Sequence, residues 1–443
     1  MASAAEQLAA NFNFSNLGKA KELRDRILFT IAVLILARLG TYIPIPGVDP
    51  HQLSVMMSKA SGGLLDMFNL LSGGAITRMA IFGLSIMPYI SASIILQLMQ
   101  TVIPELEALK KEGEVGRKTL NQYTRYLTVF LAAIQAMGVA FALQQQPGLV
   151  IEPGSFFLVS TVITLTGGTI LLMWMGEQIT SRGVGNGISL IILVGIVARF
   201  PTSVSQLFEA GRTGEISPFV IFAIFAGAIA LILFIVFVER AQRRLLVQYP
   251  KRQVGNRMFG GESSHLPLKL NVSGVIPPIF ASSILTVPLT YAAFAGANTP
   301  EWLQTLMAYI GPTKPLYFIL YGGMIIFFAF FYTSIVFNPE ETAENLKKYG
   351  GFIPGIRPGK KTAEYIDYVL TRTTVVGALY LAIVCLIPEF LRRDVTSILT
   401  LGGTSILIIV SVTMDTIAQI QSHLIAQQYE GLIKKAKLRG ARR

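Results

Sequence analysis

Ten apolar runs, each long enough to cross a lipid bilayer, alternate with short polar or glycine-rich segments along this chain. A transmembrane helix needs about 20 mostly apolar residues. The runs lack the strict apolar–polar alternation of a transmembrane β-strand. The pattern therefore predicts an all-α integral membrane protein, because helices satisfy their backbone hydrogen bonds inside the bilayer. The predicted spans are 27–45, 76–100, 124–145, 156–176, 185–201, 217–238, 272–294, 315–337, 373–390 and 398–420.

Composition agrees with a membrane protein and argues against other classes. Of the 443 residues, 52% are apolar and only 14% are charged, whereas a soluble chain carries about 25% charged residues. A single cysteine, Cys385, allows no internal disulfide. The three histidines lie in unrelated segments, so we expect neither a metal site nor a cofactor. The first 18 residues lack the basic patch and cleavage site of a signal peptide, and we expect the first apolar run to be retained.

Positive charge is divided unequally between the two alternate sets of loops. The set that begins with the N-terminus holds 29 of the 37 Lys and Arg residues, and the opposite set holds seven. Cytoplasmic loops carry the excess of such residues, so both termini are predicted to be cytoplasmic, in agreement with an even number of spans. This bias is the first explanation of the net charge of +12, and we expect no direct DNA binding.

Two loops on the basic side, 239–271 and 338–372, exceed thirty residues each. Topology control and attraction to lipid headgroups account for such charge about as well as a dedicated function does. Orienting a helix requires far fewer residues, however, so the length also favours a docking platform for an acidic partner. The basic residues of these two loops include Arg243, Arg244, Lys251, Arg252, Lys347, Lys348 and Arg357. Their individual assignment to docking is implied by the family resemblance given below.

An internal repeat links spans that are five apart. Residues 86–96 (IMPYISASIIL) and 275–285 (VIPPIFASSIL) share six of eleven positions, and residues 186–194 (NGISLIILV) and 402–410 (GGTSILIIV) share four of nine. Five is an odd number, so the two halves enter the membrane from opposite sides, as in inverted-topology repeats. Chance similarity between apolar segments is the alternative, but both matches agree on the same offset.

The chemistry of several function classes is absent from the sequence. Ion-coupled transporters place ionisable side chains near the middle of the bilayer, and here the main exception to an uncharged interior is Arg38 in the first span. The cluster at Gly359-Lys360-Lys361-Thr362 lacks the first glycine of a phosphate-binding loop. A passive polypeptide channel therefore fits better than a secondary transporter, a lipid flippase or a membrane enzyme.

Isoleucines recur at helical spacing in the repeated spans. Ile86 and Ile90 share one helix face, and so do Ile188 and Ile192. The repeat aligns Ile90 with Ile279 and Ile192 with Ile408. Four helices thus offer an isoleucine at corresponding depth, which could form an apolar collar that excludes water and ions by dewetting. On spacing alone, ordinary helix packing is the favoured interpretation.

Prolines and serines mark the second and seventh spans. We expect Pro88, Pro277, Pro278 and Pro288 to interrupt the backbone hydrogen bonds inside these spans. The serines that follow, Ser91, Ser93, Ser282 and Ser283, could form a slightly polar seam between the two helices. Interhelical hydrogen bonding is at least as good an explanation for each serine taken singly.

Several long motifs resemble the bacterial SecY family of protein-translocase channels. The resemblance extends from about residue 20 to the C-terminus. The motifs are YIPIPGVDP (42–50), FNLLSGGA (68–75), IMPYISASIILQL (86–98), GEQITSRGVGNGIS (176–189), SSHLPLKLN (263–271), FNPEETAENLKK (337–348), PGIRPG (354–359) and GGTSILI (402–408). One position departs from the family pattern, because Glu340 stands where a basic residue is expected.

The resemblance implies ten transmembrane helices in two inverted five-helix halves around a central pore, with a gate that opens sideways into lipid. It implies a pore ring formed by Ile86, Ile90, Ile188, Ile192, Ile279 and Ile408, and a lateral gate that includes Ser91 and Ser283. It also implies a plug in the outer funnel, formed by Gly62, Gly63, Leu64, Leu65, Asp66, Met67, Phe68, Asn69, Leu70, Leu71, Ser72, Gly73 and Gly74.

The expected organisation follows from this resemblance together with the span pattern. A cytoplasmic segment (1–26) precedes the first half (27–201), the second half (217–420) carries both long loops, and a basic tail (421–443) ends the chain. The implied partners are small SecE and SecG subunits, the SecA motor ATPase, the ribosome, lipids and polypeptides that bear a signal sequence. The implied location is the bacterial cytoplasmic membrane.

Overall fold

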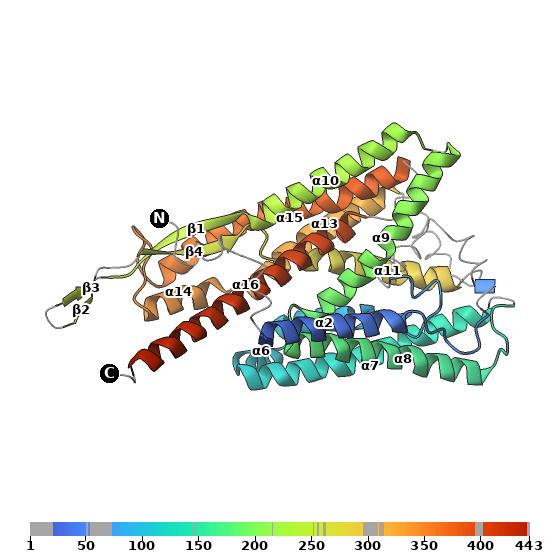
Figure 1. The fold of residues 1–443 in the computed structure, drawn as a ribbon, viewed down its shortest axis with the longest axis horizontal. Coiled ribbons are helices and arrows are strands. Elements are labelled where there is room, and N and C mark those ends of the chain that lie inside the picture. Colours follow the sequence, from blue (N-terminus) through green and yellow to red (C-terminus); the bar gives the residue numbers. More distant parts are fainter. Residues whose placement is uncertain are drawn as a thin grey trace. The chain divides into compact units, whose positions relative to one another are not determined.

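The computed structural model shows a chain built almost entirely of helices (Figure 1). The structure describes residues 21–49, 52–53, 73–145, 148–214, 216–250, 252–254, 257–259, 263–295, 309, 314–394 and 402–440. The chain divides into two compact units. The first comprises Met1–Val204, Ala293–Asn298 and Val412–Arg443, and the second comprises Ser205–Ala292 and Thr299–Ser411.

The first unit is a bundle of helices that pack through small residues. On α7 the side chains of Thr128, Ala132, Ala136 and Ala140 are fully buried at every fourth position. Small residues at this spacing let neighbouring helices approach closely within a membrane. The helices that begin in this unit are α2 (Lys21–Gly40), α5 (Met87–Val102), α6 (Pro104–Lys111), α7 (Glu114–Gln145), α8 (Ser155–Arg182) and α9 (Gly187–Thr213).

The last helix, α16 (Gly403–Gly440), contributes its C-terminal part to the first unit. There Leu424 packs in one apolar cluster with Leu23 of α2 and Val184, which precedes α9. The backbone N–H of Gly185 also donates to Oε1 of Gln419 at 2.9 Å. These contacts join both ends of the chain to the loop that leads into α9.

The second unit combines helices with two small β-hairpins. Strands β1 (Gln242–Gln248) and β4 (Ser263–Lys269) pair antiparallel, with Leu245 opposite Leu266. Strands β2 (Arg252–Val254) and β3 (Arg257–Phe259) pair in the same way. The helices are α10 (Pro218–Arg240), α11 (Ile276–Ala295), α13 (Pro315–Val336), α14 (Pro339–Lys348) and α15 (Lys360–Asp394).

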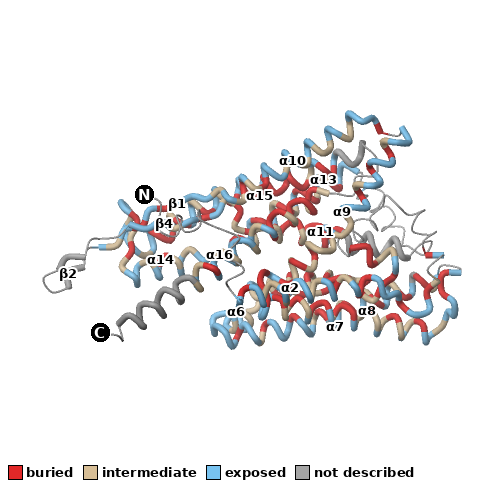
Figure 2. Tube along the Cα trace, in the orientation of Figure 1, coloured by how far each residue is buried: buried red, intermediate tan, exposed pale blue. Residues whose placement is uncertain are grey.

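Each of the ten predicted spans overlaps a helix of the structure, although the bounds differ. Among the described residues, seven helices are long and apolar enough to cross a membrane, and eight if α5 and α6, which meet at a bend of 100°, count as one span. Burial differs between these helices, because α15 is rich in buried residues whereas α10 is exposed over most of its length (Figure 2). An apolar helix that is exposed in this way is suited to contact with lipid.

The prolines correct one sequence prediction. Pro88 lies at the start of α5, which begins at Met87, and Pro277 and Pro278 lie in the first turn of α11. These three prolines therefore begin helices and do not interrupt them. A proline costs little there, because the first backbone N–H groups of a helix have no partner within it. The predicted span 76–100 is accordingly helical only from Met87, and residues 73–86 form turns and an isolated bridge.

Candidate functional site

Four helices of the internal repeat begin at the same repeat position. In the first pair of repeats, α5 begins at Met87 and α11 begins at Ile276, the second residue of each copy. In the other pair, α9 begins at Gly187 and α16 begins at Gly403, again the second residue. The alignment made from sequence is thus reproduced by the backbone, although the four segments lie far apart in the chain.

Glycines allow these helix starts to pack against a neighbouring backbone. A Cβ atom on Gly187 would lie 2.0 Å from the carbonyl oxygen of Gly176 in α8. A Cβ atom on Gly403 would lie 2.1 Å from the carbonyl oxygen of Val384 in α15. Real Cβ atoms do not approach this closely, so only glycine fits at either position. The aligned glycines thus have the same role in the two halves.

The turns before α5 and α11 repeat the same conformation. Ser85 has φ of 53° and Gly274 has φ of 62°, and each residue stands two positions before its helix. Gly168 would clash with the carbonyl oxygen of Ile81 at 2.0 Å, and Gly377 with that of Leu270 at 2.6 Å, if either carried a Cβ atom. Both turns are therefore packed closely against a glycine of a neighbouring helix. They differ in that Ser85, which is not a glycine, adopts the left-handed conformation that favours glycine.

The six isoleucines of the predicted ring lie close to these helix starts. Ile86 is the N-cap of α5, Ile90 lies in the first turn of α5, and Ile279 lies in the first turn of α11. Ile86, Ile90, Ile192 and Ile408 are buried, and Ile188 and Ile279 are half-buried. None of the six belongs to the exposed class that many apolar residues of this chain occupy. This distribution is what a ring that faces the protein interior requires, but the same burial also fits ordinary packing.

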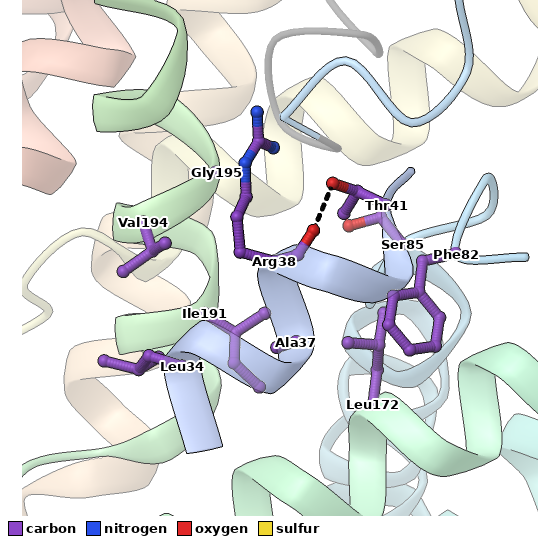
Figure 3. Close-up of a pocket in the computed structure, with 10 residues that line it drawn as sticks. All are labelled: Leu34, Ala37, Arg38, Thr41, Phe82, Ser85, Leu172, Ile191, Val194 and Gly195. Carbon is purple, nitrogen blue, oxygen red and sulfur yellow. Dashed lines mark hydrogen bonds between the residues drawn. The ribbon is translucent and has the colours of Figure 1, made fainter. Parts of the chain in front are cut away.

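Arg38, the charged residue of the first span, borders a small cavity beside this region (Figure 3). Its Nη1 donates to the carbonyl oxygen of Gly73, and its guanidinium lies 5.2 Å from the ring centre of Tyr42. A second guanidinium, that of Arg78, lies 4.1 Å from the same ring. The residues that line the cavity are Leu34, Ala37, Arg38, Thr41, Phe82, Ser85, Leu172, Ile191, Val194 and Gly195.

The two long basic loops form one structure. The backbones of Gln248 in β1 and Phe352 exchange two hydrogen bonds of 2.9 Å. Leu245 and Leu268 of the hairpin share an apolar core with Ile353 and with Ile366 of α15. The paired residues are about a hundred positions apart in the chain. The two loops were therefore predicted as separate segments, because no local pattern indicates such a long-range pairing.

Arg357 projects from a rigid turn of this joint structure. Two glycines with left-handed backbones flank it, Gly355 with φ of 81° and Gly359 with φ of 102°. The Thr362 hydroxyl donates to the carbonyl oxygen of Arg357 at 3.1 Å, and Ile356 packs against the apolar core. The Arg357 side chain itself is exposed and has no recorded ion pair with any described residue. A fixed backbone beneath an exposed guanidinium suits the recognition of a partner's carboxylate.

Comparison with known proteins identifies the family. The SecY family model matches residues 80–417. The protein translocase subunit SecY of Rickettsia bellii is 55% identical over 433 residues, which are 97% of this chain and 100% of the relative. The chain belongs to the SecY family. The relative is matched over the whole of its length.

Solved structures of this family share the fold at low identity. A SecY structure that shows how the plug domain stabilises the closed channel and maintains a membrane seal has a TM-score of 0.63 and 18% identity. Sec61 in a canine ribosome–channel complex has a TM-score of 0.57, also at 18% identity. Each match covers 91% of this chain and 93% of the other. The all-α membrane fold predicted from sequence is therefore confirmed.

The predicted SecY plug lies mostly outside the described residues. Only Gly73 and Gly74 at its C-terminal end are described, and both have left-handed backbones, with φ of 65° and 88°. Gly73 is packed so closely that a Cβ atom would lie 2.6 Å from Nη1 of Arg38 and 2.9 Å from Cα of Gly195. The end of the segment is therefore held between α2 and α9.

The two serines predicted for the lateral gate have different surroundings. Ser91 lies half-buried on α5. Ser283 is buried on α11, and its hydroxyl donates to the carbonyl oxygen of Ile279 at 2.7 Å. The neighbouring hydroxyl of Ser282 donates to the same oxygen at 2.9 Å. Both hydroxyls thus bond to the backbone of their own helix, as serine commonly does within helices.

The remaining residues of the docking prediction are distributed over the two basic loops. Arg243 and Arg244 are exposed on β1, and Lys347 and Lys348 are exposed on α14. Nζ of Lys348 lies 3.7 Å from Oε1 of Glu344. This carboxylate partly offsets the positive charge that Lys348 presents to a partner. Lys251 lies outside the described residues, and for Arg252 only the backbone is described, in β2.

Glu340 is explained by its place in α14. It lies in the first turn of that helix, and its backbone N–H donates to Oδ1 of Asn338 at 3.0 Å. A carboxylate at this end of a helix is favoured by the helix dipole. The departure from the family pattern therefore suits the local helix.

Two polar pairs that tie helices to their neighbours were not predicted from the sequence. Arg125 of α7 and Glu177 of α8 form a two-pronged ion pair with both N–O distances at 2.8 Å. Asn271, which ends one of the recognised motifs, donates to Glu239 of α10 at 2.7 Å. Their signal was present as polar residues at the edges of spans, but nothing in the sequence indicates which of them meet.

Proposed function

We propose that this chain is the central channel subunit of the Sec translocon in the bacterial inner membrane. It conducts unfolded secretory polypeptides across the membrane and releases membrane-protein segments into lipid through a lateral gate. The observation that carries this function is the 55% identity to a SecY translocase subunit over the whole of that relative. An uncharged interior supports it, since a coupled transporter needs ionisable groups there.

The barrier is an apolar collar formed by Ile86, Ile90, Ile188, Ile192, Ile279 and Ile408. Its support is the position of the four aligned isoleucines within the first two turns of helices that begin at matching repeat positions. Isoleucine is branched at Cβ, which restricts χ1 and keeps the rim defined. A narrow aliphatic ring excludes water and ions by dewetting, and it can widen around a polypeptide because it contains no fixed charge.

Opening is driven by the substrate. A signal sequence is itself an apolar helix, and it inserts between α5 and α11, which carry Ser91 and Ser283. Separation of these helices widens the collar and displaces the plug formed by residues 62–74. The plug assignment is supported by the related structure whose plug domain maintains a membrane seal.

The driving energy comes from partners, because the chain carries no phosphate-binding loop. The exposed basic surface of β1, α14 and the Arg357 turn binds the SecA motor or the translating ribosome. The fold is shared with Sec61 in a ribosome–channel complex, which supports the second partner. Small SecE and SecG subunits complete the translocon, and both termini lie in the cytoplasm, where the positive charge is concentrated.

A covalent link between α5 and α11 is expected to block transport. The test introduces Ser91→Cys and Ser283→Cys, together with Cys385→Ala to remove the native thiol. A bifunctional thiol reagent of short span should then stop translocation of a secretory substrate into proteoliposomes. Either single-cysteine variant treated alike is the control. Unhindered transport through the linked protein would contradict the lateral gate.

Reversal of charge at Arg357 is expected to weaken motor coupling. Arg357→Glu removes an exposed guanidinium from a turn whose backbone is fixed by other contacts. We expect at least about a tenfold loss of motor-driven translocation with normal membrane assembly, since a charged contact of this kind is worth about 2 kcal/mol. Lys361→Glu is the control, because Lys361 already pairs with Glu364 at 2.7 Å. Normal transport by the Arg357 variant would remove the docking assignment.

A further inference from the structure

A buried polar network holds the turn that leads into α11. Asn271 is 4% exposed, and its amide nitrogen donates to Oε1 of Glu239 at 2.7 Å and to the carbonyl oxygen of Gly274 at 3.2 Å. Its amide oxygen accepts from the hydroxyl of Ser273 at 3.1 Å. Both ends of one side-chain amide are thus used within a single turn.

The network ties this turn to two other helices of the same unit. Glu239 lies at the C-terminal end of α10, and its Oε1 also accepts from the hydroxyl of Tyr380 on α15 at 3.5 Å. The backbone N–H of Leu270 donates to the carbonyl oxygen of Ala241 at 3.0 Å. The carbonyl of Leu270 is in turn packed against Gly377 of α15. The residues before α11 are therefore fixed from two sides.

At the corresponding turn of the first half, the described residues form no such side-chain network. Asn271 stands four residues before the repeat copy at 275–285, and Phe82 stands four residues before the copy at 86–96. Phe82 is buried and packs with Ala37 of α2 and Leu172 of α8. The same turn is thus fixed by apolar packing in one half and by hydrogen bonds to a carboxylate in the other.

We propose that Asn271 is a positioning residue for the pore and the gate. By fixing the turn at residues 271–275, it sets where α11 begins, and so places Ile279 and Ser283. A short charge-assisted hydrogen bond is directional, and it fixes this helix start more sharply than apolar contact alone. This inference rests on the proposed function for its effect on transport, but the placement of α11 can be measured separately.

The test replaces Asn271 with aspartate in the full-length protein. Asn271→Asp sets a carboxylate against Glu239, and the resulting repulsion should release the turn. We expect faster hydrogen exchange of the backbone amides of residues 276 and 279–282, and a resting ion conductance in planar bilayers raised at least about fivefold. Asn271→Ala, which removes the hydrogen bonds without adding charge, should act in the same direction but less strongly.

A second substitution separates the hydrogen bond from general damage. In the double variant Asn271→Asp with Glu239→Gln, the glutamine amide donates to the new carboxylate, so exchange and conductance should both return toward the original values. Asn345→Asp, an exposed change of the same kind on α14, is the control and should alter neither.

Three results would overturn the inference. The first is unchanged hydrogen exchange at the start of α11 in Asn271→Asp, and the second is failure of Glu239→Gln to reverse a change in exchange. The third is raised exchange with unchanged ion conductance, in a channel whose conductance does rise when Ile90 and Ile279 are replaced with serine. If substitutions in the isoleucine ring also leave conductance unchanged, the collar fails. A reversible change of exchange would then still support the placement of α11 by Asn271.

Discussion

Replacing Ile90 and Ile279 together with serine is expected to open a resting leak for ions. The two residues occupy the same repeat position in α5 and α11. Ile90 is buried and Ile279 is half-buried, whereas many other isoleucines of this chain are exposed. Burial of one such side chain is worth about 1.5–3 kcal/mol. Loss of two should lower the barrier to water by at least about 2.7 kcal/mol, which corresponds to about a hundredfold rise in conductance. The measurement is single-channel or bulk conductance in planar bilayers without substrate.

The chain supplies a matched control for this experiment. Ile95 and Ile284 also occupy one repeat position in the same two helices, but they are 37% and 42% exposed. Ile95→Ser with Ile284→Ser makes the same chemical change on the outer surface and should leave the resting conductance unaltered. A ring variant no leakier than this control would show that the ring isoleucines are ordinary packing residues.

Adding a single methyl group at Gly187 or at Gly403 is expected to destabilise the protein strongly. Gly187→Ala would place Cβ 2.0 Å from the Gly176 carbonyl oxygen, and Gly403→Ala would place it 2.1 Å from that of Val384. Both obstacles are backbone atoms, so a helix must shift by about 1 Å to restore contact distance. We expect a loss of about 2–3 kcal/mol in the free energy of unfolding for each variant, measured by thermal or denaturant unfolding in detergent.

Two other glycines provide the comparison. Gly167 in α8 and Gly323 in α13 have no atom within 4 Å of an added Cβ. Gly167→Ala and Gly323→Ala should therefore be neutral or stabilising by about 0.5–1 kcal/mol, because alanine favours the helix. Equal stability of Gly187→Ala and Gly167→Ala would mean that the close packing at the start of α9 is not required.

The repeat shows how far local sequence could lead. The alignment of Ile90 with Ile279 and of Gly187 with Gly403 required only identical residues at a fixed offset. The structure then placed all four helix starts at the same repeat position. Pro88, Pro277 and Pro278 were misread, because a proline inside an apolar run can mark either a break in a helix or its beginning. Which one applies depends on whether the preceding residues find other hydrogen-bond partners.

The two long basic loops show where local sequence was insufficient. Their charge and length indicated a binding surface, but their joining at Gln248 and Phe352 was not visible. The exposure of Arg357 likewise depends on an apolar core that includes Leu245 and Ile366. Such a core is made of aliphatic residues, which are common throughout this chain, so no sequence motif predicts it.

The sequence by itself determined the membrane class, the order of the apolar helices, the repeat and the family. These properties depend on hydropathy, on charge distribution and on sequence identity to relatives. All three can be determined along the chain without knowledge of tertiary contacts. Only the tertiary structure decided that the glycines of α9 and α16 pack on neighbouring backbones, that two loops share one core, and that Asn271 meets Glu239. Those properties depend on contacts between distant residues, and side-chain type alone does not select the partner.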